Sequence, residues 1–450
     1  MFSTFREAIS YLFATYTSSK SHRGTGYDQE TRTPWYTRTL LDRMGSPDRK
    51  ARNILVTGSK GKGSTSRLIA ELLESQGLRV GLFTSPHLID YTERIRVNGR
   101  AIEESDMMRI LAQMQPFIEE IRSTFGPRDY FGPVGLIAVI AAIYFQEHQT
   151  DVNVIELGRG ARYDDVNQLS GELAVVTPIL WEHADCLGPN IEQIAWHKSG
   201  VIHAGMRAVI VGRQGPEAES VLRAEAQTLG VDYREMCFAF SVKNVRPDRT
   251  GVRFSVTTQY GEREHLHVSL LGSHQADNAG VALETVEYFL GHAVPLDAIT
   301  RAFQQIVIPG RCQLLPPGQN HPEVLIDGAI NRESASYVAH WLDRFAQGPV
   351  YAVVGIPREK DYSGALAWLG PRAAEIYVTV AANPHLHFPQ DALQVAQAWC
   401  PAHYVQDSSE AIGQAMAKAG PQGIVVIMGT QSLVGEALSY FQVPTRHTHP

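Results

Sequence analysis

The stretch TGSKGKGST, residues 57–65, decides how the rest of the chain is interpreted. The apolar run NILV precedes it and the helix-like run SRLIAELLESQG follows, which is the strand–loop–helix order of a phosphate-binding loop. Glycines let backbone N–H groups approach phosphate oxygens, a lysine neutralises their charge, and a hydroxyl can reach a magnesium ion. A flexible basic turn is the alternative interpretation, because Gly, Lys and Ser all favour loops. We therefore predict a nucleotide site formed by Gly58, Gly61, Lys62, Gly63, Ser64 and Thr65.

Short apolar runs alternate with helix-like runs on both sides of this loop. LRVGLFTSP, VNVIELG, ELAVVTPI and RAVIVG read as further strands, which predicts a parallel sheet with its ligands at the carboxyl ends of the strands. Residues 231–272 alternate polar and apolar side chains and read as antiparallel strands. Four more apolar runs, EVLIDG, PVYAVVG, EIYVTV and GIVVIMG, predict a second α/β unit. We expect two domains, 1–300 and 301–450: a P-loop ATPase domain with a parallel and a small antiparallel sheet, then a smaller Rossmann-like α/β domain.

Composition excludes several classes of function. The net charge of −7 gives no nucleic-acid surface, and no run approaches the roughly 18 apolar residues of a membrane helix. The first residues, MFSTFREAISYLFATY, have the spacing of an amphipathic helix rather than of a signal peptide. The four cysteines are scattered, without a C-x-x-C pair. We expect a cytoplasmic and monomeric protein with small-molecule partners, no nucleic acid and no membrane.

Three further stretches place polar side chains after predicted strands. FTSPHLIDYTERIRVNG carries Ser85, VIELGRGARYDDVN carries Glu156, and WEHADCLGPNIEQIAWHKSGVI carries His183 and Lys198. An acidic residue after a strand can hold a cation near phosphates, as in other P-loop enzymes. Position alone predicts Glu156 as a metal ligand. A surface loop is the better explanation of the first stretch from its residues alone, and a capped helix with ordinary surface charge is the alternative for the third.

Together these stretches resemble one family, the folylpolyglutamate synthases and dihydrofolate synthases of the Mur ligase superfamily. Its phosphate loop reads close to GTNGKGST, and its next loop resembles TSPHL…ERI.VNG. Its segments E-x-G-x-G-G-R-x-D-A-T-N, D-H-x-x-x-L-G and E-K-A-G-I resemble residues 156–167, 182–188 and 197–201. Later in the chain SHQADNAG, PGRCQ, LIDGAINRES, REKDYSG and MGTQSLVGE resemble further motifs of the family in the same order. The resemblance spans about residues 35–440.

This resemblance implies a reaction and a set of roles. ATP phosphorylates a carboxylate, and an amino group then attacks the acyl phosphate to form an amide. Ser85 and Glu156 would hold one magnesium ion, and His183 with a carbamylated Lys198 would help hold a second. Asn278, Arg311 and Asp327 would hold ATP, the last two from the small domain. ATP and Mg²⁺ are thus the implied cofactors, and Lys62, His183 and Lys198 are the implied catalytic residues.

The chain departs from the family pattern at several positions. Gly132 and Gly135 replace a glutamate and a threonine in a segment that lies near the pterin-side substrate in the family, and Asp165 replaces an alanine. Ile330 replaces a histidine, His385 stands where arginine is common, and Glu182 and His197 replace an aspartate and a glutamate. The activation chemistry is retained in this pattern, whereas the acceptor and donor pockets are altered.

Three functions follow as hypotheses. The first is an ATP-dependent ligase that adds L-glutamate to dihydropteroate or a folate. The second is a sibling ligase that joins a different amino acid and carboxylate in another pathway. The third is a nucleotide-binding regulator without catalysis, which the retained Lys62, Glu156, His183 and Lys198 disfavour.

Overall fold

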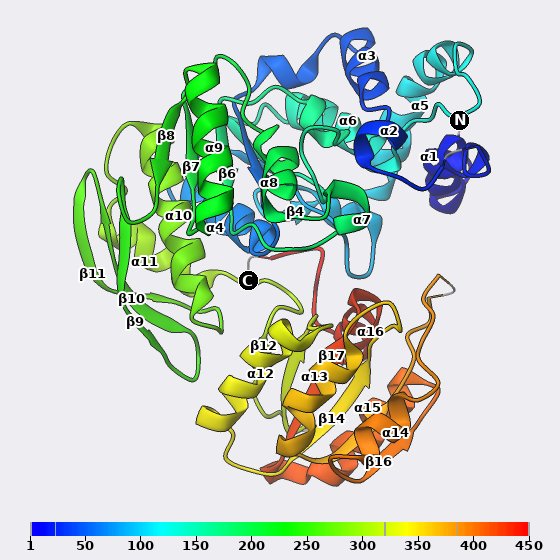
Figure 1. Cartoon of the computed structure of the whole chain (residues 1–450), viewed down its shortest axis with the longest axis vertical. Helices are drawn as coiled ribbons and strands as arrows, with labels where there is room; N and C mark the ends of the chain where they lie inside the picture. Colours follow the sequence, from blue (N-terminus) through cyan, green and yellow to red (C-terminus); the bar gives the residue numbers. More distant parts are fainter. Residues whose placement is uncertain (1, 23, 319–320, 384, 449–450) are drawn as a thin grey trace.

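The structure is a computed structural model that describes residues 2–22, 24–318, 321–383 and 385–448. The molecule has two α/β parts stacked along its long axis (Figure 1). The larger part contains an eight-stranded and a three-stranded sheet, and the smaller part contains a six-stranded sheet. No helix among the described residues is long and apolar enough to cross a membrane.

The eight-stranded sheet confirms the predicted parallel core. Its order is β4-β3-β2-β5-β1-β6-β7-β8, and only the β2–β3 and β3–β4 pairs are antiparallel. The strands are β1 Asn53–Thr57, β2 Val80–Phe83, β3 Ile95–Val97, β4 Arg100–Ala101, β5 Val152–Glu156, β6 Leu173–Val176, β7 Ala208–Val211 and β8 Asp232–Glu235.

Both faces of this sheet are covered, which explains why its inner strands β1, β2, β5, β6 and β7 are buried and largely apolar. Side chains alternate between the faces, so Leu55 of β1 packs in one core cluster while Ile54 and Val56 pack in the other. One face carries α1 Phe5–Ser18, α3 Trp35–Arg43, α5 Glu104–Arg122, α6 Pro133–Glu147, α8 Ile191–Ser199 and α9 Pro216–Leu229. The other carries α4 Lys62–Glu74, α10 His274–Leu290 and α11 Leu296–Gln305.

The predicted antiparallel region is correct except at its start. Strands β9 Ser241–Pro247, β10 Val252–Thr258 and β11 Gly261–Val268 form the three-stranded antiparallel sheet. Residues 232–235, however, pair in parallel with β7 as the edge strand β8 of the large sheet. The alternating pattern of residues 231–235 is that of an edge strand with one solvated face, which a hairpin strand shares.

The smaller part has the predicted α/β architecture. Its sheet order is β12-β13-β17-β14-β15-β16, parallel except for β12. The strands are β12 Gln313–Leu315, β13 Glu323–Asp327, β14 Val350–Gly355, β15 Ala373–Val378, β16 Ala402–Tyr404 and β17 Ile424–Gly429. Helices α12 Arg332–Phe345, α13 Tyr362–Leu369 and α14 Ala392–Gln397 cover one face, and α15 Ser408–Ala419 and α16 Gln431–Tyr440 cover the other.

Contacts that join the two parts include an ion pair and the C-terminal segment. Arg249, between β9 and β10, forms an ion pair of 2.6 Å with the buried Glu323 of β13. After α16 the chain returns to the larger part, where the N–H of Ala101 donates to the carbonyl of Arg446 at 2.9 Å (Figure 1). The loops at the carboxyl ends of β1, β5 and β6 lie near this junction.

Candidate nucleotide and ligase site

The predicted phosphate loop runs from the end of β1 to the start of α4. Its backbone requires glycine at two positions, because φ is 138° at Gly58 and 86° at Gly61. A Cβ on Gly58 would lie 2.0 Å from the hydroxyl oxygen of Thr177, and a Cβ on Gly61 would lie 2.7 Å from Oδ1 of Asn278. The loop is therefore packed tightly against Asn278 of α10, a residue for which the family resemblance implies a role in ATP binding.

Lys62 begins α4 and folds back over the loop. Its Nζ donates to the carbonyl of Gly58 at 2.8 Å. Three residues on, Thr65 is buried, and its hydroxyl oxygen has no hydrogen-bond partner among the described residues. Free N–H groups at the start of a helix, an adjacent ammonium and an unsatisfied hydroxyl are the groups that a nucleotide phosphate requires.

Glu156 ends β5, the neighbour of β1, and faces this loop. Its carboxylate accepts a hydrogen bond of 3.1 Å from the N–H of Ser85, and a Cβ on Gly63 would lie 3.5 Å from its Oε2. Burial raises the pKa of Glu156, and the charges of Lys62 and Arg311 oppose that rise. A buried carboxylate suits Mg²⁺, which prefers oxygen ligands, so Glu156, with the hydroxyl-bearing Ser85 bound to it through its N–H, fits the first predicted magnesium site.

Lys198 lies fully buried in α8 beneath the loop. Its Nζ donates to the carbonyl of Gly58 at 2.9 Å, to the carbonyl of Arg159 at 2.7 Å and to Oε1 of Glu182 at 3.3 Å. Burial, reinforced by the charge of Lys62, lowers its pKa to about 7. An ammonium that donates to three oxygens is not a metal ligand, so the second predicted magnesium site depends on carbamylation of this amine.

His183 lies just after β6, in the left-handed conformation with φ of 51°. Burial lowers its pKa, and the charges of Lys198 and of Lys360 from the smaller part act in the same direction. Within residues 2–22, 24–318, 321–383 and 385–448, no group of three His, Cys, Asp or Glu side chains is arranged as a metal site. His183 and Lys198 therefore stay predicted ligands of a second ion.

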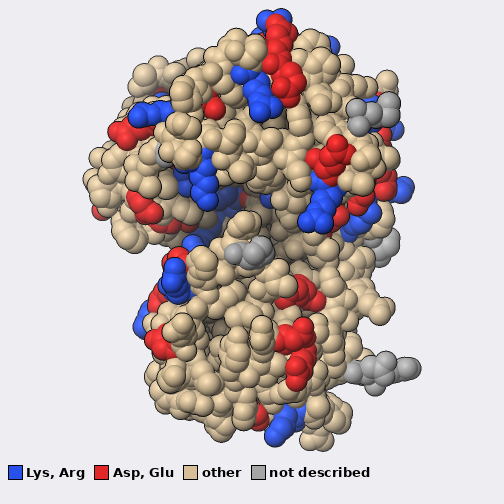
Figure 2. Space-filling model, turned by 90° about the vertical axis from the view of Figure 1, so that its right-hand side faces the viewer, with Lys and Arg blue, Asp and Glu red and all other residues tan. Residues whose placement is uncertain are grey.

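Two predicted residues of the smaller part lie at the junction. Asp327, at the end of β13, accepts a hydrogen bond of 2.7 Å from the N–H of Cys312. Burial raises the pKa of Asp327, and the charge of Arg311 opposes that rise at Asp327 as it does at Glu156. The guanidinium of Arg311 thus acts on carboxylates of both parts. Figure 2 shows Lys and Arg side chains along the hollow between the two parts, where a nucleotide's negative charge would be favoured.

Sequence reasoning missed an ion-pair chain beside Lys198. Asp28, in the short helix α2 Asp28–Thr31, receives a hydrogen bond of 3.2 Å from Nε of Arg159 and lies 3.6 Å from Nε of Arg32. Arg32 in turn donates to Asp165 at 3.1 Å. No motif marks residues 28 and 32 in the sequence, because the segment before α3 has no periodicity and the partners Arg159 and Asp165 are more than 130 residues away along the chain.

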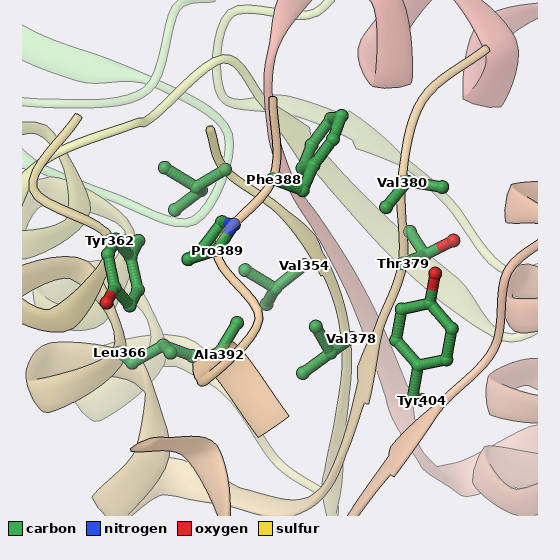
Figure 3. Close-up of a pocket in the computed structure, with 11 residues that line it drawn as sticks. Val354, Tyr362, Leu366, Val378, Thr379, Val380, Phe388, Pro389, Ala392 and Tyr404 are labelled. Carbon is green, nitrogen blue, oxygen red and sulfur yellow. The ribbon is translucent and has the colours of Figure 1, made fainter. Parts of the chain in front are cut away.

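The departures in the smaller part have simple packing consequences. Ile330 packs against the apolar core under α12 and α13, so it offers no polar contact in place of the family's histidine. His385 is exposed. A small apolar cavity of about 20 Å³ lies nearby, lined by side chains that include Tyr362, Phe388 and Tyr404 (Figure 3). That volume holds roughly one water molecule, so this cavity is not a substrate site.

Known proteins match the chain over nearly its whole length. The Mur ligase middle domain matches residues 56–286, and the Mur ligase glutamate ligase domain matches residues 310–431. Dihydrofolate synthase/folylpolyglutamate synthase of Bacillus subtilis is 30% identical over 404 residues, which cover 88% of this chain and 92% of that protein. Folylpolyglutamate synthase (FPGS) of Mycobacterium tuberculosis, solved with ADP and AMPPCP, superposes with a TM-score of 0.85 at 26% identity, covering 97% of this chain and 99% of that one. An FPGS–AMPPCP–folate complex superposes with a TM-score of 0.79 at 26% identity, covering 98% and 100%.

Proposed function

The chain belongs to the folylpolyglutamate synthase/dihydrofolate synthase family of the Mur ligase superfamily, and on that basis we propose that it is an ATP-dependent ligase that adds L-glutamate to dihydropteroate or a folate. The observation that carries the proposal is the convergence on the loop at Gly58–Gly63. Asn278 contacts it from α10, Glu156 from β5 and Lys198 from α8, while the charge of Arg311 reaches Glu156 from the smaller part.

The chemistry assigns different tasks to these residues. The acceptor's carboxylate oxygen attacks the γ-phosphorus of ATP, which releases ADP and gives an acyl phosphate. The amino group of glutamate then attacks the acyl carbon, phosphate leaves, and the nitrogen loses a proton to form the amide. The N–H groups of the loop and Lys62 bind the phosphates, and Asn278, Arg311 and Asp327 position the nucleotide. A magnesium ion held by Ser85 and Glu156 would shield negative charge on the phosphates; His183 and carbamylated Lys198 are the proposed ligands of a second ion.

The proposal is tested by ADP release from magnesium-ATP with dihydropteroate plus L-glutamate, and with tetrahydrofolate plus L-glutamate. Each substrate is omitted in turn. Lys62→Ala should abolish release, whereas Lys418→Ala, at an exposed lysine of α15, should leave it unchanged. ADP release that is independent of the folate-side substrate or of glutamate would contradict the assignment. A parent protein with no ATP turnover under any condition would favour the non-catalytic regulator.

A sibling ligase with a different substrate pair is the second candidate. The specific observation in its favour is that the family's glutamate, threonine and histidine at positions 132, 135 and 330 are replaced by Gly132, Gly135 and Ile330. A panel of other amino acids and carboxylates separates the two candidates, because only the sibling ligase would release ADP with a non-folate pair and not with a folate.

The remaining proposals concern the whole protein. We propose a monomeric enzyme, and we propose that it is cytoplasmic, since its four cysteines are all free thiols, as a reducing compartment favours. We also propose two domains, expected at residues 1–300 and 301–450, and move their division to the connection 306–312, because α11 packs on the larger sheet as far as Gln305 and β12 begins at Gln313. Sedimentation of the pure protein and expression of the two segments test these statements.

A further inference from the structure

Three departures from the family pattern meet at one point of the structure. A Cβ on Gly132 would lie 2.2 Å from Oδ2 of Asp165, and a Cβ on Gly135 would lie 2.6 Å from Cβ of Asp165. A glutamate at 132 or a threonine at 135 therefore cannot coexist with Asp165 in this arrangement. Compared with the family pattern, this chain lacks the carboxylate at position 132 and has an additional one at position 165. The region therefore keeps a carboxylate, but it comes from the loop after β5.

The carboxylate of Asp165 forms an ion pair with Arg32. Asp165 is 3% exposed, accepts from Nη1 of Arg32 at 3.1 Å and accepts from the hydroxyl of Thr37 at 3.3 Å. Burial raises the pKa of Asp165 to about 6, and the charge of Arg32 opposes that rise. A buried carboxylate is stable here only with its cation, so the two residues act as a unit.

Arg32 keeps donors available beyond this pair. Its side chain is 23% exposed. In the part of the chain that the structure describes, its Nη2 has no hydrogen-bond partner, while Nη1 contacts Asp165 and Nε lies 3.6 Å from Asp28. Asp28 and Asp165 face Nε and Nη1 of the guanidinium, so the hydrogens of Nη2 are the donors that can meet a further oxygen in the same plane.

The position of Arg32 relates it to the reaction centre. Asp28 joins Arg32 to Arg159, and the carbonyl of Arg159 accepts the hydrogen bond from Lys198 beneath the phosphate loop. The acceptor's carboxylate must reach that loop to be phosphorylated. The rest of the acceptor must then extend away from the loop, and the segment 28–32 is linked to the loop through Arg159 and Lys198.

We propose that Arg32 is a specificity-determining residue that binds an oxygen of the acceptor, and that Asp165 is the positioning residue that orients it. This inference rests on the proposed function, since it names a contact of the same ligase. The oxygen belongs either to the ring system of the acceptor or to the α-carboxylate of a glutamate already attached. Both are planar oxygen acceptors, and substrates with and without a first glutamate distinguish them.

The test compares Arg32→Gln with the parent and with Arg207→Gln, which breaks an exposed pair of 2.6 Å with Glu172. KM is measured separately for dihydropteroate, monoglutamyl tetrahydrofolate, ATP and L-glutamate. We expect Arg32→Gln to raise the KM for the acceptor by about tenfold or more, because the variant loses a charged hydrogen bond to it. The KM values for ATP and for glutamate should stay within about twofold of those of the parent. A rise with both acceptors assigns the ring oxygen; a rise with the glutamylated acceptor alone assigns the α-carboxylate.

A rescue separates positioning from general damage to the fold. Asp165→Ala should raise the acceptor KM in the same way as Arg32→Gln. Asp165→Ala combined with Gly132→Glu, which restores the family's residues, should recover much of the loss. If the combined variant does not fold, titration calorimetry of acceptor binding to Arg32→Gln and to the parent measures the contribution of Arg32 directly.

The possible outcomes separate a failure of the role of Arg32 from a failure of the proposed ligase activity. An active parent with an unchanged acceptor KM in a folded Arg32→Gln variant overturns the role of Arg32 alone. Equal rises in all four KM values also overturn it, because they indicate a structural effect. A parent that turns over neither acceptor contradicts the proposed function, and this inference with it.

Discussion

Lys198 places a buried amine in contact with the phosphate loop. Its titration should make the free energy of unfolding depend on pH. Its pKa is about 7 in the folded protein, because of burial and the charge of Lys62, whereas a solvated lysine titrates near about 10.4. Between these values the unfolded chain holds the proton and the folded chain does not, so the free energy of unfolding rises with pH. Below about pH 7 both states are protonated, and the cost of burying the charge is present in full.

Lys198→Met removes this titration and should flatten the pH dependence. Urea unfolding in bicarbonate-free buffer at pH 7 and pH 9 measures the change. We expect the parent to gain about 2 kcal/mol more than the variant over this interval, since each pKa unit corresponds to about 1.4 kcal/mol. Lys418→Met, at an exposed site, is the control. Equal pH dependence in parent and Lys198→Met would contradict a lowered pKa.

Gly61 offers a second test at the residue scale, with a matched control in Gly77. Their φ angles are 86° and 80°, but a Cβ on Gly77 meets nothing within 4 Å, whereas one on Gly61 meets Asn278. Both substitutions by alanine should cost about 1 kcal/mol of stability for the left-handed backbone. Only Gly61→Ala should also weaken ATP binding, by about tenfold or more, in calorimetric titration with AMPPCP. Equal ATP affinity in the two variants would contradict the packing of the loop on Asn278.

Sequence reasoning succeeded at this scale where a residue type carries chemistry within a local motif. Lys62 follows β1 and Glu156 ends β5, and the structure brings the two side chains close enough for the charge of Lys62 to act on Glu156, while their roles stay predictions. It failed for Arg32 because the partner, Asp165, is more than 130 residues away and only the fold brings them together. The departures at Gly132 and Asp165 were visible separately, but their compensation required coordinates.

Among the strands, those with a clear local sequence pattern were predicted correctly, and one whose position depends on tertiary contacts was not. The continuous apolar runs of β1, β5, β6 and β7 predicted buried parallel strands, because only strands covered on both faces are apolar throughout. The edge strand β8, with the pattern DYRE, has no such run and was assigned to the antiparallel region. Its place in the large sheet depends on contacts with α10 rather than on its own periodicity.

One ion pair joins β8 to α10 and supports a prediction for these two elements. Nε of Arg234 lies 2.7 Å from Oε1 of Glu284, which is 1% exposed, and burial raises the pKa of Glu284 against the charge of Arg234. Arg234→Gln leaves this carboxylate buried without its cation and should cost about 3 kcal/mol of stability. Arg234→Gln with Glu284→Gln should cost less than the single variant, by urea unfolding. Strict additivity in this cycle would contradict direct coupling.

At the scale of the whole molecule, the last described residues act as a strap between the two parts. After α16 the chain leaves the smaller part, and Arg96 of β3 donates to the carbonyls of Thr445 and Arg446 at 2.6 and 3.0 Å. The hydroxyl of Thr445 donates to Glu93 at 2.8 Å. Glu93 also accepts from the N–H groups of residues 88–90, in the loop that follows Ser85. The strap therefore couples the smaller part to the loop that carries a predicted magnesium ligand.

Thr445→Val tests this coupling without changing the shape of the side chain. It leaves Glu93, which is 5% exposed, short of one hydrogen bond and should lower the free energy of unfolding by about 1 to 3 kcal/mol. Because the same carboxylate orders the loop after Ser85, the variant should also require more magnesium for half-maximal ADP release. Arg446→Ala is the control: it removes a pair with the exposed Glu103 but keeps the backbone contacts, so it should cost less than about 1 kcal/mol. A Thr445→Val variant that loses stability but keeps the magnesium dependence of the parent would show that the strap holds the two parts together without acting on the site.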